Sequence, residues 1–131
     1  MKDFQYVAPK TLREALSCLS LHGDNSRILA GGTDLLVQMR GKKYQPEYVI
    51  DVKQIPELNE LSYVNRKGLV IGASVPCFRL YNDPNIVERY PGIIDSASII
   101  GGIQIQGRAT LGGNLCNSTP SADTTPALIA Y

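Results

Sequence analysis

The sequence has little of what metal centres require. Its 131 residues include three cysteines, one histidine and no tryptophan. Cys18, Cys77 and Cys116 are far apart and form no close pair, so the ligand spacing typical of zinc sites is absent. Three thiols are also too few for the four ligands of an iron–sulfur cluster. We therefore expect reduced thiols and no metal site.

Strong charge and long apolar runs are missing as well. The formal net charge is +1, which gives no strong attraction to nucleic acid or an anionic membrane. No apolar run approaches the roughly 18 residues of a spanning helix. The N-terminus has no apolar stretch of the kind that a signal peptide needs. We expect a cytoplasmic protein without a membrane span, and its 44% hydrophobic content is sufficient for a packed core.

Residues 1–55 predict a β-α-β-α-β unit. Three short apolar segments have the composition of strands: 4–8, 27–30 and 48–52. Thr11 and Glu14 have the spacing of a capping box, which begins a helix that ends near Gly23. Asp34 and the preceding threonine are candidates to cap a second helix that runs to about Met39. This alternation predicts a small parallel sheet covered by helices.

Residues 56–131 predict a different arrangement. Segments 61–64 and 69–72 are expected to form a hairpin around a turn at 65–68. A helix is expected over 92–100, whereas the glycine-rich segment 101–114 is expected not to be helical. A final helix begins after residue 123 and is cut off at Tyr131, so we expect the chain to be the front part of a longer protein.

Two glycine-rich loops indicate a possible anion site. Gly31–Asp34 follows a predicted strand, where glycine lets backbone N–H groups approach a phosphate. Thr110–Asn114 offers further N–H groups, a hydroxyl and a carboxamide, and two such loops suit the two phosphates of a dinucleotide. The patterns of an NTPase P-loop and of a Rossmann site are absent. Ordinary tight turns explain each loop as well, so the residues alone leave both interpretations open.

Two longer segments resemble the paired flavin motifs of a known family. Residues 28–36, ILAGGTDLL, and residues 109–123, ATLGGNLCNSTPSAD, are similar to motifs of the FAD domain in molybdopterin dehydrogenases. That family includes the flavin subunits of xanthine, carbon monoxide and nicotinate dehydrogenases. Segments 50–52 and 71–73 also resemble its strands, and the similarity runs from about Phe4 to Tyr131.

This resemblance implies an α+β fold with two FAD-binding subdomains, of the type shared by vanillyl-alcohol oxidase and the molybdopterin dehydrogenases. Residues 1–55 would form a small βαβαβ first subdomain, with a diphosphate loop at 29–35. Residues 56–131 would form part of a mixed-sheet second subdomain, with a second flavin loop at 108–123. The C-terminal remainder of the subunit would be absent.

The resemblance also implies the cofactor contacts. The first loop would hold the FAD diphosphate through its backbone, flanked by apolar side chains that line the nucleotide. The second would surround the diphosphate and ribityl chain, with Asp123 as a hydroxyl acceptor or, alternatively, the cap of the last helix. The predicted cofactor-binding residues are Ile28, Leu29, Ala30, Gly31, Gly32, Thr33, Asp34, Leu35, Thr110, Gly112, Gly113, Asn114 and Asp123.

Two features of these motifs bear on single residues. Gln106 stands where many relatives have arginine, which removes a charge at that position. We expect Gly32→Val to abolish FAD retention while leaving the fold largely intact. No residue is assigned a catalytic role, because the flavin ring carries the redox chemistry.

The function implied by the resemblance is that of the FAD-binding subunit of a molybdenum hydroxylase. Electrons would pass from iron–sulfur clusters on a small partner subunit through FAD to NAD⁺ or another acceptor, and molybdopterin would lie on a large partner subunit. The fragment alone is expected to be inactive. Two alternatives stay open: a standalone FAD-dependent oxidoreductase of the same flavin-fold superfamily, and a non-catalytic nucleotide-binding module.

Overall fold

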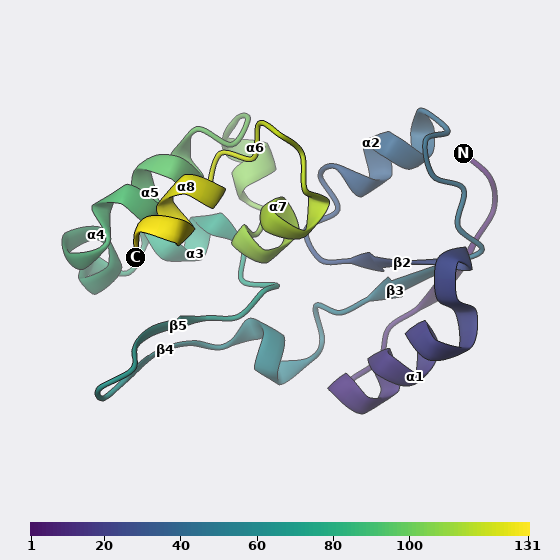
Figure 1. The fold of residues 1–131 in the computed structure, drawn as a ribbon, viewed down its shortest axis with the longest axis horizontal. Coiled ribbons are helices and arrows are strands. Elements are labelled where there is room, and N and C mark those ends of the chain that lie inside the picture. The colour runs from purple at the N-terminus through teal and green to yellow at the C-terminus, as the bar shows by residue number, and fades with distance from the viewer.

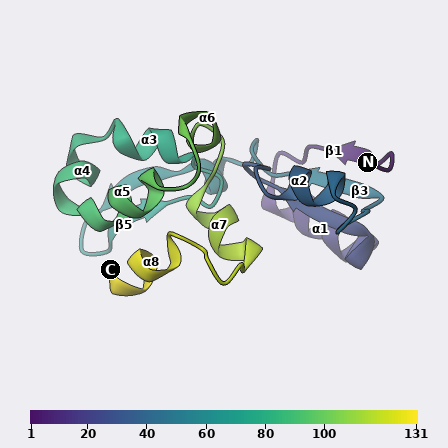
Figure 2. The same ribbon diagram turned by 90° about the horizontal axis from the view of Figure 1, so that it is seen from above.

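A computed structural model describes residues 1–131, which form two lobes side by side (Figures 1 and 2). The first lobe contains β1 (Gln5–Val7), α1 (Leu12–His22), the 3-10 turn η1 (Gly23–Asn25), β2 (Ser26–Leu29), α2 (Leu35–Arg40) and β3 (Tyr48–Asp51). A second 3-10 turn, η2 (Pro56–Asn59), leads to the second lobe. This lobe contains β4 (Leu61–Val64), β5 (Gly68–Ile71), α3 (Cys77–Tyr81), α4 (Pro84–Arg89), α5 (Pro91–Ser98), α6 (Ile103–Gln106), α7 (Leu111–Asn117) and α8 (Thr125–Ala130).

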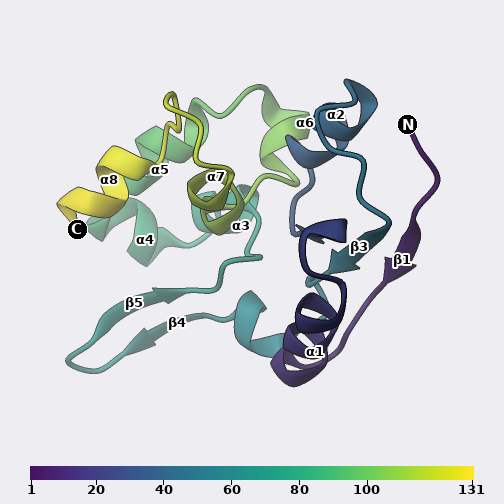
Figure 3. The ribbon, with the colours of Figure 1, turned by 45° about the vertical axis from the view of Figure 1, so that its right-hand side comes forward.

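The first lobe is built on a parallel sheet with strand order β1-β3-β2. The chain crosses from β1 past β3 to β2 and then steps back to β3. Because both crossovers are right-handed by strong preference, opposite directions of travel put their helices on opposite faces. Accordingly, α1 and α2 lie on opposite sides of the sheet (Figures 1 and 3). The predicted parallel sheet with covering helices is confirmed.

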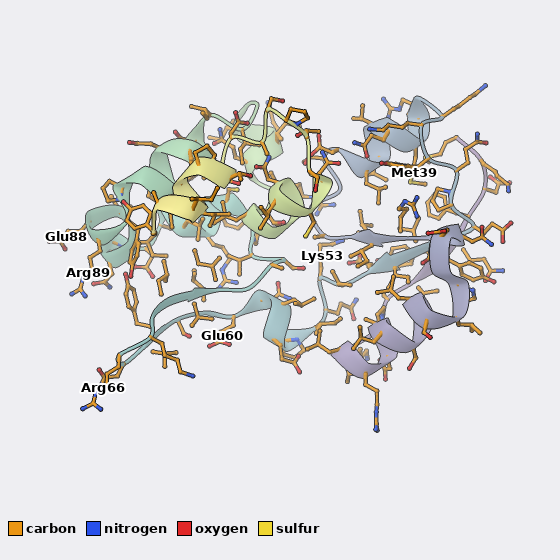
Figure 4. All side chains as sticks on the ribbon, viewed as in Figure 1. Met39, Lys53, Glu60, Arg66, Glu88 and Arg89 are labelled. Atoms are coloured by element: carbon orange, nitrogen blue, oxygen red, sulfur yellow. The ribbon has the colours of Figure 1, made fainter.

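The strand β3 is central and is buried on both faces. Ile50 packs with Ala15 of α1, together with Val52 and Ile55. Val49 points to the opposite face, because side chains alternate along a strand. Met39, which is 2% exposed, points from α2 toward the sheet on its own side (Figure 4). Burial on both faces explains why 48–52 is almost continuously apolar in the sequence.

The helix α1 begins and ends as the sequence predicts, with one difference. Thr11 Oγ1 accepts the N–H of Glu14 at 3.2 Å, and Gly23 ends the helix with a φ of 48°. The Glu14 carboxylate, however, accepts the N–H of Lys10 at 2.8 Å instead of closing a capping box on Thr11. One bond of the expected pair is therefore present, and the other is displaced by one residue, from the N–H of Thr11 to that of Lys10.

The second lobe packs helices against one antiparallel hairpin. The strands β4 and β5 pair as predicted, and the turn between them spans residues 65–67; Arg66 in the turn and Gly68 at the start of β5 both have positive φ. Arg66 lies at the hairpin tip, far from the helices (Figure 4). The core beneath the helices is formed by nine buried residues: Val75, Cys77, Leu80, Ile86, Ile93, Ala97, Ile100, Ala109 and Leu111. With a parallel sheet in one lobe and a separate hairpin with helices in the other, the α+β class is confirmed.

The prediction that 101–114 is not helical was wrong. Helix α6 occupies Ile103–Gln106, and α7 starts at Leu111. Glycine lowers helix propensity, but Thr110 caps α7 by accepting the N–H of Gly113 at 2.9 Å. Local capping and packing of Leu111 in the core thus outweigh the cost of the two glycines.

Candidate functional site

The first glycine loop presents unpaired backbone donors. It follows β2 at the carboxyl end of the parallel sheet, where α/β proteins commonly bind ligands. None of the N–H groups of residues 31–35 donates to a backbone or side-chain acceptor within the chain. Gly32 has a φ of 79°, a left-handed conformation that suits glycine. Asp34 occupies the position before α2, but its side chain makes no capping hydrogen bond, so the predicted cap is wrong.

Gly32 is more constrained than the sequence suggested. A Cβ there would meet Cδ1 of Leu29 at 2.6 Å, in addition to the strain of the positive φ. Valine at this position would disturb the loop and its packing on Leu29. These costs are local to the loop, since the close atom is the end of a flexible side chain, so the expectation that Gly32→Val leaves the fold largely intact stays a prediction.

The second glycine loop is held mainly by its own side chains. Thr110 is 3% exposed and uses Oγ1 to cap α7. Asn114 Oδ1 accepts from both the N–H and the hydroxyl of Thr124, at 3.2 and 2.7 Å. The N–H group of Gly112, which lines the cleft, has no acceptor within the chain, whereas that of Leu111 faces Val75 across the β-bridge between Pro76 and Thr110. This loop therefore offers a free donor at Gly112 on a framework that is already fixed.

The two loops meet where the lobes come closest. A Cβ on Gly31 would lie 2.2 Å from the carbonyl oxygen of Arg108, so only glycine permits this approach. Gly112 packs in the same way against Ala73, at 2.6 Å from an added Cβ to the Ala73 Cβ. Between α2 and α7, Gln38 Nε2 donates to Asn117 Oδ1 at 3.0 Å. Figure 3 shows α2 beside the second-lobe helices at this junction.

A cleft of about 670 Å³ lies at this junction and takes walls from both lobes. It is lined by every predicted cofactor-binding residue except two, Leu29 and Asp123. Leu29 supports the loop at Gly32 instead. Asp123 is exposed and makes no hydrogen bond within the chain. It does not cap the last helix either, because Thr124 precedes α8.

Several cleft residues were missed by sequence reasoning. One apolar wall is formed by Leu12, Leu16 and Leu19 of α1, whose helical spacing had suggested only a core face. Arg27 and Tyr44 also line the cleft, and the Arg27 guanidinium lies 4.7 Å from the centre of the Tyr44 ring. Ser74, which follows β5, also lines the cleft. No sequence signal marks these residues, because the fold alone brings them to one place.

The sequence also singled out Gln106, His22 and the cysteines, and the structure shows what each of them contacts. Gln106 is buried and donates to the carbonyl of Ser98 at 2.6 Å, so it braces the turn after α5. His22 stacks on Tyr48 with ring centres 3.5 Å apart. The cysteines are unpaired; Cys116 is exposed and lines the cleft, whereas burial raises the pKa of the Cys77 thiol to about 11.

One charged cluster stabilises the end of β3. Asp51 is 5% exposed and accepts hydrogen bonds from the Tyr6 hydroxyl and from Lys53, whose Nζ lies 2.7 Å away. Burial raises the pKa of Asp51, but the hydrogen bonds from Lys53 and Tyr6 and the charge of Lys53 outweigh it and hold the pKa below its ordinary value. No group of three or more His, Cys, Asp or Glu side chains is placed to hold a metal ion. None of the helices combines the length and apolar character needed to cross a membrane.

Comparison with known proteins identifies the family. The model of the FAD binding domain in molybdopterin dehydrogenase matches residues 2–131. The chain belongs to this family. The assignment made from the two flavin motifs is thereby confirmed, and the paired glycine loops lie within the matched region of this FAD-binding domain.

Individual relatives agree with the family. The chain is 37% identical over 129 residues to the nicotinate dehydrogenase FAD-subunit of Eubacterium barkeri, covering 98% of this chain and 43% of that protein. It is 34% identical over 131 residues to the xanthine dehydrogenase FAD-binding subunit of Escherichia coli O157:H7, covering 98% of this chain and 44% of that protein. The chain thus spans less than half of the length of these relatives.

The fold is similar to a solved structure of the same class. Reconstituted carbon monoxide dehydrogenase from Oligotropha carboxidovorans superposes with a TM-score of 0.88 at 30% identity, over 93% of this chain and 42% of that one. This similarity covers both lobes and confirms the fold of the FAD-binding domain.

Proposed function

We propose that the cleft between the two lobes holds FAD, and that the chain is the cofactor-binding part of a flavin subunit in a molybdenum hydroxylase. The observation that carries the proposal is the row of unpaired N–H groups at residues 31–35. Residues 31–35 all line the cleft, so one anionic group bound there can accept from several of these donors together. A diphosphate supplies several anionic oxygens in one place.

The surroundings of these donors fit a flavin dinucleotide. The cleft volume of about 670 Å³ lies within the usual range for ligand pockets. Gly31 and Gly112 let two backbone segments come closer than any side chain would allow. The apolar wall of Leu16, Leu19 and Ile28 suits a flat heteroaromatic ring. Donors for phosphate and an apolar wall for a ring thus occur in one cleft.

The two glycine loops bind different parts of the cofactor. The N–H groups of residues 31–35 donate to one part of the diphosphate, and that of Gly112 donates from the opposite lobe. The Asn114 Oδ1 accepts hydrogen bonds from Thr124, so the amino group of Asn114 is free to donate to the ribityl chain. Thr110 fixes α7 and so positions these donors. When bound, the flavin supplies the redox chemistry, and the chain orients it.

The wider role rests on the relatives. The similar proteins are named as FAD subunits or medium chains of dehydrogenases. We infer that electrons arrive at FAD from iron–sulfur clusters on a small partner subunit, that molybdopterin lies on a large partner subunit, and that NAD⁺ or another acceptor receives the electrons. The complex would act in the cytoplasm.

Purification from the natural host, with all subunits that accompany the protein, tests this function. We expect flavin absorbance, FAD in the released cofactor, and molybdenum and iron in the co-purifying chains. Flavin without molybdenum or iron partners would favour a standalone FAD-dependent oxidoreductase. A colourless protein that also fails to take up added FAD would overturn the proposal.

A further inference from the structure

Ser74 has a buried hydroxyl that nothing in the chain satisfies. The residue is 3% exposed, and its Oγ is one of only two buried side-chain polar atoms without a hydrogen-bond partner. The other is the hydroxyl of Tyr81, which packs against the second-lobe core and does not line the cleft. Ser74 does line the cleft. An unpaired buried hydroxyl costs stability, so its presence in a cleft wall points to a partner that binds there.

The backbone around Ser74 is held firmly. Its N–H donates to the carbonyl of Leu58 at 2.8 Å, and the next residue, Val75, is fully buried. On one side Ala73 packs against Gly112, and on the other Pro76 forms an isolated β-bridge with Thr110. Ser74 is thus fixed to the second glycine loop at two points, and rotation about χ1 is the freedom left to its hydroxyl.

The groups beside Ser74 indicate which kind of ligand atom its hydroxyl would bind. Gly112, at the start of α7, also lines the cleft, and its N–H group has no acceptor within the chain. An amide donor beside a hydroxyl that can also donate suits an oxygen atom that accepts from both.

We propose that Ser74 is an additional cofactor-binding residue whose hydroxyl donates to an oxygen of the diphosphate–ribityl part of FAD. The inference rests on the proposed function and extends the site beyond the two glycine loops. It also explains why a polar side chain is kept at a buried position of the wall. Rotation about χ1 turns the hydroxyl to the cofactor when the cleft is filled.

The test compares Ser74→Ala with a matched control, Ser96→Ala. Ser96 lies in α5 outside the cleft lining and donates to the carbonyl of Ile93 at 3.0 Å. Both variants are made in the full-length protein. Two quantities are measured after removal of flavin: the dissociation constant for FAD, by fluorescence quenching, and the melting temperature.

Ser74→Ala is expected to bind FAD about tenfold more weakly, as the loss of one hydrogen bond to a charged or polar oxygen predicts. Its flavin-free melting temperature should be unchanged or higher, because an unsatisfied hydroxyl has been removed. Ser96→Ala should show the reverse: unchanged FAD binding and no gain in melting temperature. Ser74→Cys keeps the shape with a weaker donor, so its affinity should fall between wild type and Ser74→Ala.

Distinct results would overturn the two proposals. If the wild-type protein binds no FAD, the proposed function fails, and the role of Ser74 fails with it. If wild type binds FAD and Ser74→Ala binds equally well, only the role of Ser74 is refuted. A lowered flavin-free melting temperature in both Ser74 variants would assign the hydroxyl to the fold and also refute the inference.

Discussion

The two glycine loops face the same cleft, yet they are built in opposite ways. In the first, five consecutive backbone donors are unpaired, and the side chains of Thr33 and Asp34 make no hydrogen bonds. In the second, the side chains of Thr110 and Asn114 are hydrogen-bonded within their own lobe, and the Gly112 N–H is a free donor at the cleft. One loop is therefore a binding surface with little internal support, and the other is a preformed frame.

Because of this difference, substitutions in the first loop should mainly affect ligand binding, and substitutions in the second loop should mainly affect the stability of the fold. Substitutions in the first loop change how closely its backbone approaches the second loop and how tightly the ligand binds, because its side chains contribute few hydrogen bonds to the fold. Substitutions in the second loop act on the fold first and on binding through the fold. A ligand that joins both loops should stabilise the first more, since only bound oxygen atoms satisfy its donors.

The largest effect is expected where the loops touch. In Gly31→Ala the new Cβ would lie 2.2 Å from the Arg108 carbonyl oxygen, which is backbone and cannot turn aside. The lobes must separate, so we expect a loss of about 1–3 kcal/mol in the free energy of unfolding, together with loss of FAD retention. Urea denaturation and flavin content measure the two effects.

Gly107→Ala is the matched control for this variant. Gly107 has helical angles, and an added Cβ would come no closer than 3.6 Å to the Gln104 carbonyl oxygen. The alanine should be neutral or should stabilise the protein by up to about 1 kcal/mol. If Gly31→Ala matched this control in both measurements, the close contact between the loops would not exist in solution.

In the second loop we expect a comparable loss of stability without the added loss of contact between the lobes. Asn114→Ala removes the acceptor of Thr124, which is fully buried, and leaves its N–H and hydroxyl unpaired. We expect the free energy of unfolding to fall by about 1–3 kcal/mol, whereas Asn114→Asp keeps an oxygen acceptor and should lose less. Thermal unfolding of the flavin-free protein measures this difference.

Asp34→Ala in the first loop provides the comparison for Asn114→Ala in the second. Asp34 is exposed and caps nothing, so its removal should change the melting temperature of the flavin-free protein very little. Equal destabilisation by Asn114→Ala and Asp34→Ala would show that the two loops do not differ as described.

The sequence predicted the elements better than it predicted the roles of single residues. Apolar strand composition and turn residues located β1 to β5, and the capping residue with helical spacing of apolar side chains located α1. The motifs located both loops, but glycine content concealed α7, since the cap at Thr110 and the burial of Leu111 decide that helix. Leu16, Tyr44 and Ser74 reach the cleft through tertiary packing, for which no local pattern exists. The position of Asp123 outside the cleft lining was also beyond local inference.

The smallest expected effect concerns acid and the support of the first loop. The pKa of Asp51 is held below its ordinary value in the folded chain, so the carboxylate stabilises the fold above the unfolded pKa. That stability is lost as the pH falls through the folded pKa. Asp51 ends β3, whose next residue, Val52, donates to the Leu29 carbonyl just before the first loop.

Acidification should therefore loosen the first lobe before the second. Hydrogen exchange followed from neutral pH into the acid range should show earlier loss of protection at β2 and β3 than in α3 to α5, after correction for the intrinsic rate. Asp51→Asn should reduce this pH dependence, because the neutral amide has no proton to gain. Two results would contradict this prediction: parallel loss of protection in both lobes, or an unchanged pH profile in Asp51→Asn. Either would show that the Asp51 carboxylate does not stabilise the first lobe selectively.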